Sequence, residues 1–432
     1  MTTGPACVGQ EPRAFFANPA TIIVAAMVTA MTFSASGAAP TPLYHLYQEH
    51  FGLTPVLVTV IFAAYVLSLL LALLTTGALS DHIGRRPTVL GALILNIVAM
   101  VMFITAGSGA ALIAARAVQG FATGVATAAL GAAILDVDRR RGAVLNSVTV
   151  FAGLTVGTLG AATLVTFGPD PAQLVYVVLL TFSGIEALLL WYMPETAQTK
   201  PGVLASLRPH VSVPIQARQP LAQLTPVTLA SWALGGFYFS LMPALVRLAT
   251  GATLPIVSGL VVAALTFSSV IAVLSLRNIP AERVLLGAIP ALALGVATTL
   301  GGVHARFVTL MLLGTMVSGL GFGAVFSGTL RTVLPLANAD ERAGLLSAFY
   351  LEGYLAFSLP AVLTGFLAPI VGLSLAADVY GSAVILMAVA SLVAIRVSRH
   401  RVRTHHVTKG VGGSVISGSP CGRSSLGPAA RP

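Results

Sequence analysis

The recurrence of long apolar segments constrains this chain more than any other feature. Each segment has about 20 residues, the length that an α-helix needs to cross the hydrocarbon core of a bilayer. Transmembrane β-barrels have shorter segments of alternating polarity, and nothing in this sequence alternates. We therefore predict an all-α polytopic membrane protein with twelve transmembrane helices. The predicted spans are 20–39, 54–76, 88–106, 111–135, 146–167, 172–193, 225–246, 254–276, 284–303, 307–333, 344–368 and 375–396.

The composition agrees with this fold class. Apolar residues make up 56% of the chain and charged residues 8%, whereas a soluble globular domain carries about 25% charged residues. The net charge of +10 does not indicate nucleic-acid binding, because the basic residues fall in loops and in the C-terminal tail, without interleaved aromatic residues. Cys7 and Cys421 lie in the terminal tails and predict neither a disulfide nor a metal site.

The basic residues also predict the orientation of the chain. With a cytoplasmic N-terminus, nearly all of the 23 Lys and Arg residues fall on the cytoplasmic side, as the positive-inside rule requires. The exceptions are Arg116, Arg247 and Arg306. We predict a multi-pass protein of the inner or plasma membrane, with both termini in the cytoplasm.

The segment 194–224 divides the chain into two halves. It is rich in Pro, Gln and Arg, and short sequences repeat on either side of it: DRRRG at 138–142 has a counterpart in DERAG at 340–344. Such duplicated halves are typical of many transporters. We predict two pseudo-symmetric six-helix bundles that share one fold. The predicted parts are a cytoplasmic tail (1–19), an N-terminal bundle (20–193), a cytoplasmic linker (194–224), a C-terminal bundle (225–396) and a disordered basic tail (397–432).

The loop between the second and third spans combines charge with glycine. Gly77 and Gly84 permit positive φ and close backbone approach, while Asp81, Arg85 and Arg86 place this loop in water. The pattern G-x-x-x-D-x-x-G-R-R resembles the loop 2–3 signature of the major facilitator superfamily of secondary transporters. The resemblance implies a conformational latch that stabilises the outward-facing state. The alternative is a short loop that only satisfies the positive-inside rule.

The fourth span carries a second family-like pattern. Arg116, Gln119, Gly120 and Gly124 resemble the R-x-x-Q-G motif of the superfamily, with Arg and Gln on one polar stripe and the glycines on a packing edge. The resemblance implies a role for Arg116 in proton transfer or substrate binding. An arginine inside the membrane should face a cavity or a partner; alternatively, it reaches the outer interface.

The fifth span departs from the antiporter signature of the family, G-x-x-x-G-P-x-x-G-G. Gly153 and Gly157 match, but Thr158 replaces the proline and alanines replace the final glycines. This departure weakens the prediction of an efflux antiporter and leaves the fold unaffected. The glycines predict helix packing or a gating function.

Two acidic residues, Glu186 and Glu352, are predicted inside the membrane. A carboxyl group removed from water can bind and release a proton during transport, so each is a candidate coupling site. Tyr350 and Tyr354 form a polar stripe on the opposite face of the helix from Glu352. If the tyrosines line the cavity, Glu352 faces another helix as a structural partner. Tyr238 in the seventh span is either a cavity-wall residue or a packing residue.

The resemblance spans roughly residues 20–396 and implies a proton-coupled transporter that works by alternating access, similar to the drug:proton antiporter branch. The sparse cavity charge favours a small organic substrate that is neutral, weakly amphipathic or monocationic. Efflux by antiport is our first prediction and uptake by symport the alternative; a transport-inactive sensor or a membrane-embedded enzyme is less favoured. We expect no cofactor. We expect the protein to work as a monomer that binds its substrate, protons and membrane lipid.

Overall fold

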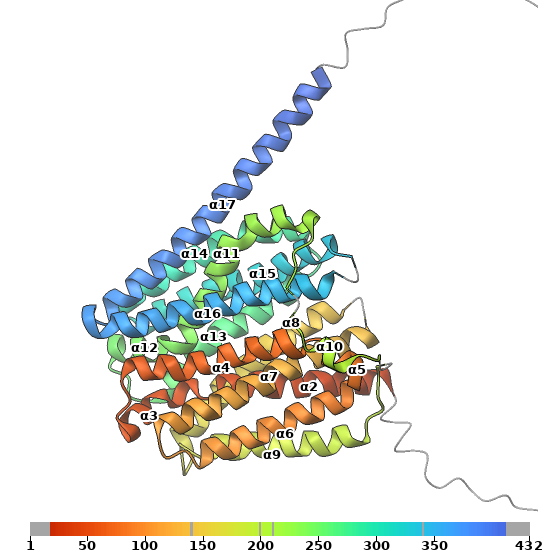
Figure 1. Cartoon of the computed structure of the whole chain (residues 1–432). Helices are drawn as coiled ribbons and strands as arrows, with labels where there is room; N and C mark the ends of the chain where they lie inside the picture. The colour runs from red at the N-terminus through yellow and green to blue at the C-terminus, as the bar shows by residue number, and fades with distance from the viewer. Residues whose placement is uncertain (1–17, 139–140, 198–199, 210, 339–340, 412–432) are drawn as a thin grey trace, which may run out of the picture. The chain divides into compact units, whose positions relative to one another are not determined.

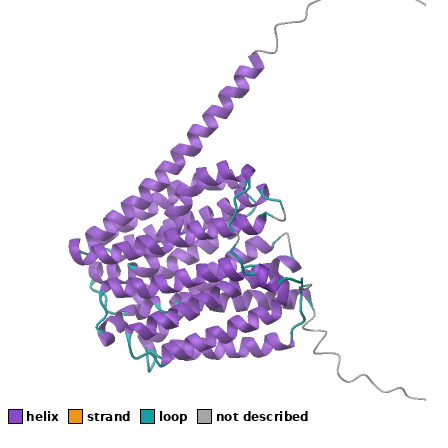
Figure 2. Cartoon of the chain, in the orientation of Figure 1, coloured by secondary structure: helices purple, strands orange, loops and turns teal. Residues whose placement is uncertain are grey.

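The computed structural model describes residues 18–138, 141–197, 200–209, 211–338 and 341–411. These residues form helices joined by loops, with no strand among them (Figure 2). The long helices are α2 (Pro19–Ala38), α4 (Pro55–Thr76), α6 (Arg85–Ile104), α7 (Gly109–Val137), α8 (Gly142–Phe167), α9 (Leu174–Tyr192), α11 (Ile215–Ser240), α12 (Met242–Thr250), α13 (Pro255–Ser275), α14 (Ala281–His304), α15 (Val308–Val333), α16 (Arg342–Val371) and α17 (Leu373–Val411). The short ones are η1 (Thr41–Leu43), α3 (Tyr44–Phe51), α5 (Leu79–Ile83), α10 (Val203–Ser206) and η2 (Leu334–Leu336).

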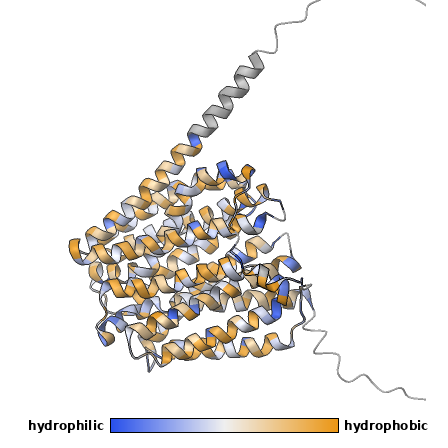
Figure 3. Cartoon of the chain, viewed as in Figure 1, coloured by the Kyte–Doolittle hydropathy of each residue, from blue (hydrophilic) through white to orange (hydrophobic). Residues whose placement is uncertain are grey.

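Among the described residues, eleven helices are long and apolar enough to cross a membrane, or up to twelve if one bent pair counts as a single span. That pair is α11 and α12, which meet at an angle of 59° within the seventh predicted span. Apolar positions dominate the long helices, and many strongly hydrophilic ones lie near helix ends (Figure 3). The prediction of an all-helical membrane protein is therefore confirmed.

Local sequence explains where several helices begin. Asn18 caps α2 by accepting a hydrogen bond from the Ala20 amide, and Thr54 caps α4 in the same way through the Leu57 amide. A proline follows each of these caps, where its missing N–H leaves no intrahelical bond unmade. These signals lie close to the predicted boundaries, so the starts of the first two spans were predicted closely.

Two predicted segments differ from the structure. Within the predicted linker (194–224), α10 forms a single turn and α11 already begins at Ile215. In the predicted C-terminal tail, α17 continues to Val411, and residues 412–432 lie outside the described part. The hydropathy of the sequence did not predict these two helical extensions, because the part of a helix that extends beyond the bilayer does not need apolar residues.

Residues up to Leu392 pack as one compact unit, and a second unit begins at Val393. In the first unit, α4 packs against α7 and α16, while α8 packs against α2 and α13 (Figure 1). We refer to residues up to 193 as the N-terminal half and to residues 215–392 as the C-terminal half. The helix pairs α4–α16 and α8–α13 join the two halves, and these contacts frame the candidate site.

Candidate functional site

The most enclosed charge in the first unit is Arg116 on α7, whose side chain is 1% exposed. Its Nη1 donates hydrogen bonds to the Gly37 carbonyl at 3.1 Å and to Oε1 of Gln119 at 2.7 Å. Its Nη2 donates to the Tyr44 hydroxyl at 3.0 Å. The guanidinium also lies 4.5 Å from the ring centroid of Tyr65, within range of a cation–π interaction. Arg116 therefore faces partners inside the protein and does not reach the outer interface.

Every one of these partners is electrically neutral. Among the described residues, no carboxylate lies within ion-pair distance of Arg116, and its Nε has no hydrogen-bond partner. Gln119 donates through Nε2 to the Ser36 carbonyl at 2.8 Å, which ties α7 to α2. The predicted pair of Arg116 and Gln119 is thus brought together as one hydrogen-bonded unit that carries an uncompensated positive charge.

Glycines allow the surrounding helices to come close enough for this arrangement. A Cβ added to Gly120 would collide with the Tyr65 carbonyl of α4, and one added to Gly124 would lie 2.5 Å from the Leu69 carbonyl. On α8, a Cβ on Gly153 would lie 2.6 Å from the Met31 carbonyl of α2, and one on Gly157 would collide with the Ala35 backbone. All four predicted glycines therefore lie at helix contacts, as the packing interpretation expects; a gating function stays a prediction.

The C-terminal half contributes a group of aromatic side chains, which we call the aromatic cluster. It consists of Trp232 on α11, Phe326 on α15, and Phe349, Tyr350, Tyr354 and Phe357 on α16. The Trp232 ring lies 4.8 Å from that of Tyr354, and the Tyr350 and Tyr354 rings are 6.0 Å apart. The predicted tyrosines are therefore brought together. Sequence reasoning missed the other four members, although aromatic residues at 349, 350, 354 and 357 follow helical spacing.

The aromatic cluster meets the N-terminal half directly. Phe62 of α4 stacks on Phe357 at 5.3 Å between centroids, and Phe151 of α8 contacts Phe326 edge-on at 5.5 Å. Phe326, Tyr350, Tyr354 and Phe357 remain partly exposed. The rings therefore border the junction of the two halves instead of being fully sealed in a helix interface.

Tyr238 does not join this group. Its side chain is 1% exposed, and its hydroxyl lies 3.1 Å from the Thr299 hydroxyl of α14 and 2.8 Å from the Thr315 hydroxyl of α15. These contacts connect three helices within the C-terminal half. The structure thus places Tyr238 as the packing alternative describes.

Glu352 lies on α16 next to Gly353, where a Cβ would collide with the Trp232 indole. The carboxyl lies beside Thr225 of α11. Its Oε1 is buried without a hydrogen-bond partner. This agrees with the alternative in which Glu352 faces a neighbouring helix while the tyrosines border the junction.

Glu186 lies on α9 and is 6% exposed. Its Oε1 accepts a hydrogen bond from the Thr32 hydroxyl of α2 at 2.5 Å, and its Oε2 is buried without a partner. The structure therefore does not bring Glu186 together with Arg116 or with Glu352.

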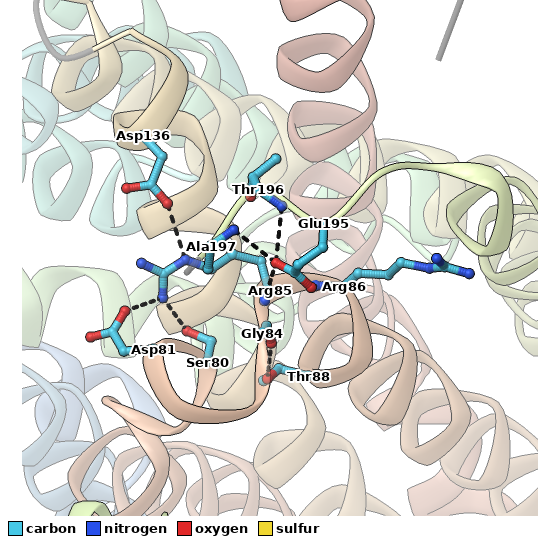
Figure 4. Close-up of polar contacts among 10 residues, drawn as sticks. All are labelled: Ser80, Asp81, Gly84, Arg85, Arg86, Thr88, Asp136, Glu195, Thr196 and Ala197. Atoms are coloured by element: carbon cyan, nitrogen blue, oxygen red, sulfur yellow. Dashed lines mark hydrogen bonds and ion pairs between the residues drawn. The ribbon is translucent and has the colours of Figure 1, made fainter. Parts of the chain in front are cut away.

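The charged loop folds as a compact network around α5 (Figure 4). The Arg85 guanidinium lies 2.5 Å from Asp81 and 3.2 Å from Asp136, the latter at the end of α7, and it also donates to the Ser80 hydroxyl at 2.5 Å. Arg86 points the other way, where it donates to the Trp191 carbonyl and lies over the Trp191 ring. The predicted loop residues thus make specific ion pairs, beyond what a positive-inside loop alone requires.

One acidic residue to which the sequence assigned no role in this loop caps it. Glu195, beyond the end of α9, accepts hydrogen bonds from the Arg85 amide at 2.8 Å and from the Arg86 amide at 3.0 Å. It also accepts from the Thr196 and Ala197 amides at 3.0 and 2.9 Å. A carboxylate at a helix N-terminus satisfies free N–H groups and the positive end of the helix dipole. Glu195 therefore fixes the start of α6.

The two loop glycines have different conformations. Gly84 has φ of +104°, and a Cβ there would lie 2.5 Å from the Glu195 carboxylate, so the position requires glycine. Gly77 has φ of −56°, in the helical region. The expectation of positive φ is therefore confirmed for Gly84 and wrong for Gly77, because the chain reverses only after α5.

The family model of the Major Facilitator Superfamily matches residues 22–359. The chain belongs to this superfamily. Its structure is similar to the crystal structure of the human organic anion transporter MFSD10 (TETRAN), with a TM-score of 0.63 and 17% sequence identity over 86% of this chain and 99% of that chain. At this identity the likeness concerns the fold alone. No curated protein matches the chain in sequence.

Membership of the Major Facilitator Superfamily identifies a multi-pass membrane protein and a secondary transporter, as the sequence predicted. Membership of the superfamily indicates a transporter and not an enzyme. The family match covers the charged loop, the Arg116 unit and the first part of the aromatic cluster helix.

Proposed function

We propose that this chain is a proton-coupled transporter that exports a small organic molecule by alternating access. The observation that carries the proposal is the aromatic cluster, whose partly exposed rings face the N-terminal half. Aromatic faces bind flat apolar groups, and they also attract a single positive charge. The substrate would lie between this cluster and the side of the N-terminal half that carries Tyr65 and Phe151.

The contacts between the halves support alternating access. The Thr155 and Thr266 hydroxyls lie 2.8 Å apart at the middle of α8. The Ile256 amide donates to Thr166 at 3.0 Å, at the end of α8 that is remote from the charged loop. By contrast, the described hydrogen bonds and ion pairs of Asp81, Arg85 and Arg86 stay within residues 78–200 and include no residue of the C-terminal half. We propose that this state is closed on the outer side, and that rocking brings the charged loop against the C-terminal half.

We propose Glu352 as the carboxyl group that couples transport to protons, with Glu186 as the second candidate. Glu352 is partly exposed and shares α16 with the aromatic cluster, so movement of this helix on substrate binding would change its surroundings. A carboxyl without a full set of partners responds strongly to such a change, because the ionised form needs water or hydrogen-bond donors.

Two substrate classes deserve separate tests. The aromatic cluster favours a neutral or monocationic aromatic compound. The neutral surroundings of Arg116 favour a monoanion instead, since a bound carboxylate would compensate the buried charge. The structural neighbour is described as an organic anion transporter, which makes this the second candidate.

Uptake by proton symport is the alternative direction. It is favoured by Thr158, which is fully buried at the position where the antiporter signature has a proline. We further propose that the protein works as a monomer in the inner or plasma membrane with cytoplasmic termini.

The test is proton and substrate flux in proteoliposomes that contain the full chain and a pH-sensitive dye. Tyr354→Leu should raise the half-saturating substrate concentration about tenfold, as expected for loss of a ring contact worth about 1.4 kcal/mol. Phe267→Leu, at a 52% exposed aromatic position on α13, is the matched control. Glu352→Gln should abolish proton flux while substrate still binds.

Opposite movement of protons and substrate would support antiport, and parallel movement would support symport instead. Wild-type proton flux in Glu352→Gln would remove this residue from the coupling assignment. Equal effects of the Tyr354 and Phe267 substitutions would remove the aromatic cluster from the substrate site.

A further inference from the structure

Two cavities border α2 and α9, away from the aromatic cluster. One, of about 550 Å³, lies between these two helices, and the other, of about 340 Å³, also borders α8. Their linings are almost entirely apolar, and Val28 borders both. The two cavities therefore form neighbouring parts of one region along α2, which we call the α2–α9 groove.

The hydrogen-bonded pair of Thr32 and Glu186 lies where the two cavities approach each other. Thr32 borders the smaller cavity and Glu186 the larger one. Glu186 is the one ionisable side chain among the described residues of either lining, and within the described chain it makes no ion pair. When Glu186 is ionised, the charge that the described lining presents to the groove is therefore negative.

The hydrogen bonding of Glu186 is incomplete. Thr32 supplies a donor to Oε1, but Oε2 is buried and has no partner, although the residue is 94% enclosed. A buried acceptor without a donor is costly, and more so when it belongs to a carboxylate in apolar surroundings. A ligand that brings a positively charged N–H donor would satisfy both the hydrogen bond and the charge.

We propose that the α2–α9 groove is a binding site for a lipophilic amine, with the ammonium group against Oε2 of Glu186 and the hydrocarbon chain along Val28. Acyl chains of phospholipids can fill apolar space but carry no donor. Where a phospholipid head group does carry an ammonium, a phosphate that the carboxylate repels lies next to it. A neutral alcohol of the same chain length offers a donor without the charge. The chemistry of the site therefore selects for the amine.

This site is separate from the aromatic cluster, although it includes Glu186, the second candidate for proton coupling. Ligand binding here is measured by labelling, without any flux measurement. The probe is a long-chain alkylamine with a photoreactive diazirine on its chain, added to the full-length protein in phosphatidylcholine nanodiscs. Crosslinked residues are mapped by peptide mass spectrometry, with and without the unmodified amine as competitor. The alcohol with the same diazirine chain serves as the neutral comparison.

We expect saturable labelling of α2 and α9 beside the groove. Glu186→Gln should lower labelling by the amine about tenfold and leave labelling by the alcohol unchanged. Val28→Phe, which fills the groove, should lower labelling by both probes. Val389→Phe is the matched control, because Val28 and Val389 are both 46% exposed and only Val28 borders the groove.

Labelling spread evenly over the outward-facing helices would overturn the proposal and indicate ordinary lipid contact. Equal labelling by amine and alcohol that Glu186→Gln does not change would also overturn it. If Glu186→Gln fails to fold, the comparison of Val28→Phe with Val389→Phe decides whether the groove is the site. If the protein shows no transport but its labelling by the amine still depends on Glu186, the proposed function fails and the amine site stands.

Discussion

The Glu195→Ala substitution tests whether the charged loop is held in place from a distant part of the chain. The Glu195 carboxylate accepts four backbone hydrogen bonds, two of them from the first turn of α6. Hydrogen bonds to charged groups contribute about 1.5–3 kcal/mol each when buried. Glu195 is exposed, so water replaces much of what is lost. We therefore expect the start of α6 to lose about 1–2 kcal/mol of local stability, including its interaction with the helix dipole.

Hydrogen–deuterium exchange measures this loss directly. A change of about 1–2 kcal/mol corresponds to amide exchange that is roughly 5 to 30 times faster, at Arg85, Arg86 and the two residues after Glu195. The effect should shrink at high salt, because the carboxylate is exposed and its field is screened.

The matched control is Glu341→Ala. The Glu341 carboxylate also accepts a hydrogen bond from a backbone amide, that of Asn338 at 3.1 Å, but it lies in the C-terminal half. The substitution should leave exchange at Arg85 and Arg86 unchanged. Unaltered exchange in Glu195→Ala would refute the reasoning, since these amides would then be protected by something other than the carboxylate. An equal increase in both variants would indicate general loosening instead of a lost cap.

Three further substitutions probe the interior. Gly120→Ala should destabilise the protein by about 1–3 kcal/mol, because its methyl group meets the Tyr65 backbone; thermal unfolding in detergent should show this, while Gly91→Ala, with open space around it, should not. Tyr238→Phe should lower stability by about 1 kcal/mol through lost hydroxyl contacts and leave the half-saturating substrate concentration unchanged; a changed value would return Tyr238 to the cavity wall. Arg116→Lys should destabilise the N-terminal half and reduce transport, because an ammonium cannot reproduce the spread of guanidinium contacts; full transport activity would contradict this.

Features that depend on the membrane were predictable from the sequence. The length of each apolar run and the position of the arginines follow from the bilayer, which acts on every helix in the same way. Partners contributed by remote segments were not predictable. Asp81 and Arg85 are only four residues apart, on either side of the turn at Gly84, so their pairing is local. Glu195 caps the same loop only because α9 ends beside α6, and no local pattern encodes that neighbour.

The aromatic residues also differ in how far the sequence predicts their contacts. Tyr350 and Tyr354 share a face of α16 by periodicity, and the structure brings them together. Tyr238 also has aromatic neighbours in sequence, yet its hydroxyl is bound by threonines of two other helices. Periodicity identifies which residues share a face of a helix. It does not identify which helix that face meets, and this second fact decides between a cavity wall and a packing contact.

The buried charge of Arg116 depends on residues that have no side chain. Gly120 lets α4 approach α7, so that the Tyr65 ring can lie over the guanidinium. A Cβ on Gly37 would collide with the Tyr65 hydroxyl, so the glycine that supplies a carbonyl to Arg116 also makes room for the ring. A larger residue at either position would move the ring and leave the cation with fewer partners. In this chain, close helix packing at Gly37 and Gly120 and the stability of the Arg116 charge therefore depend on each other.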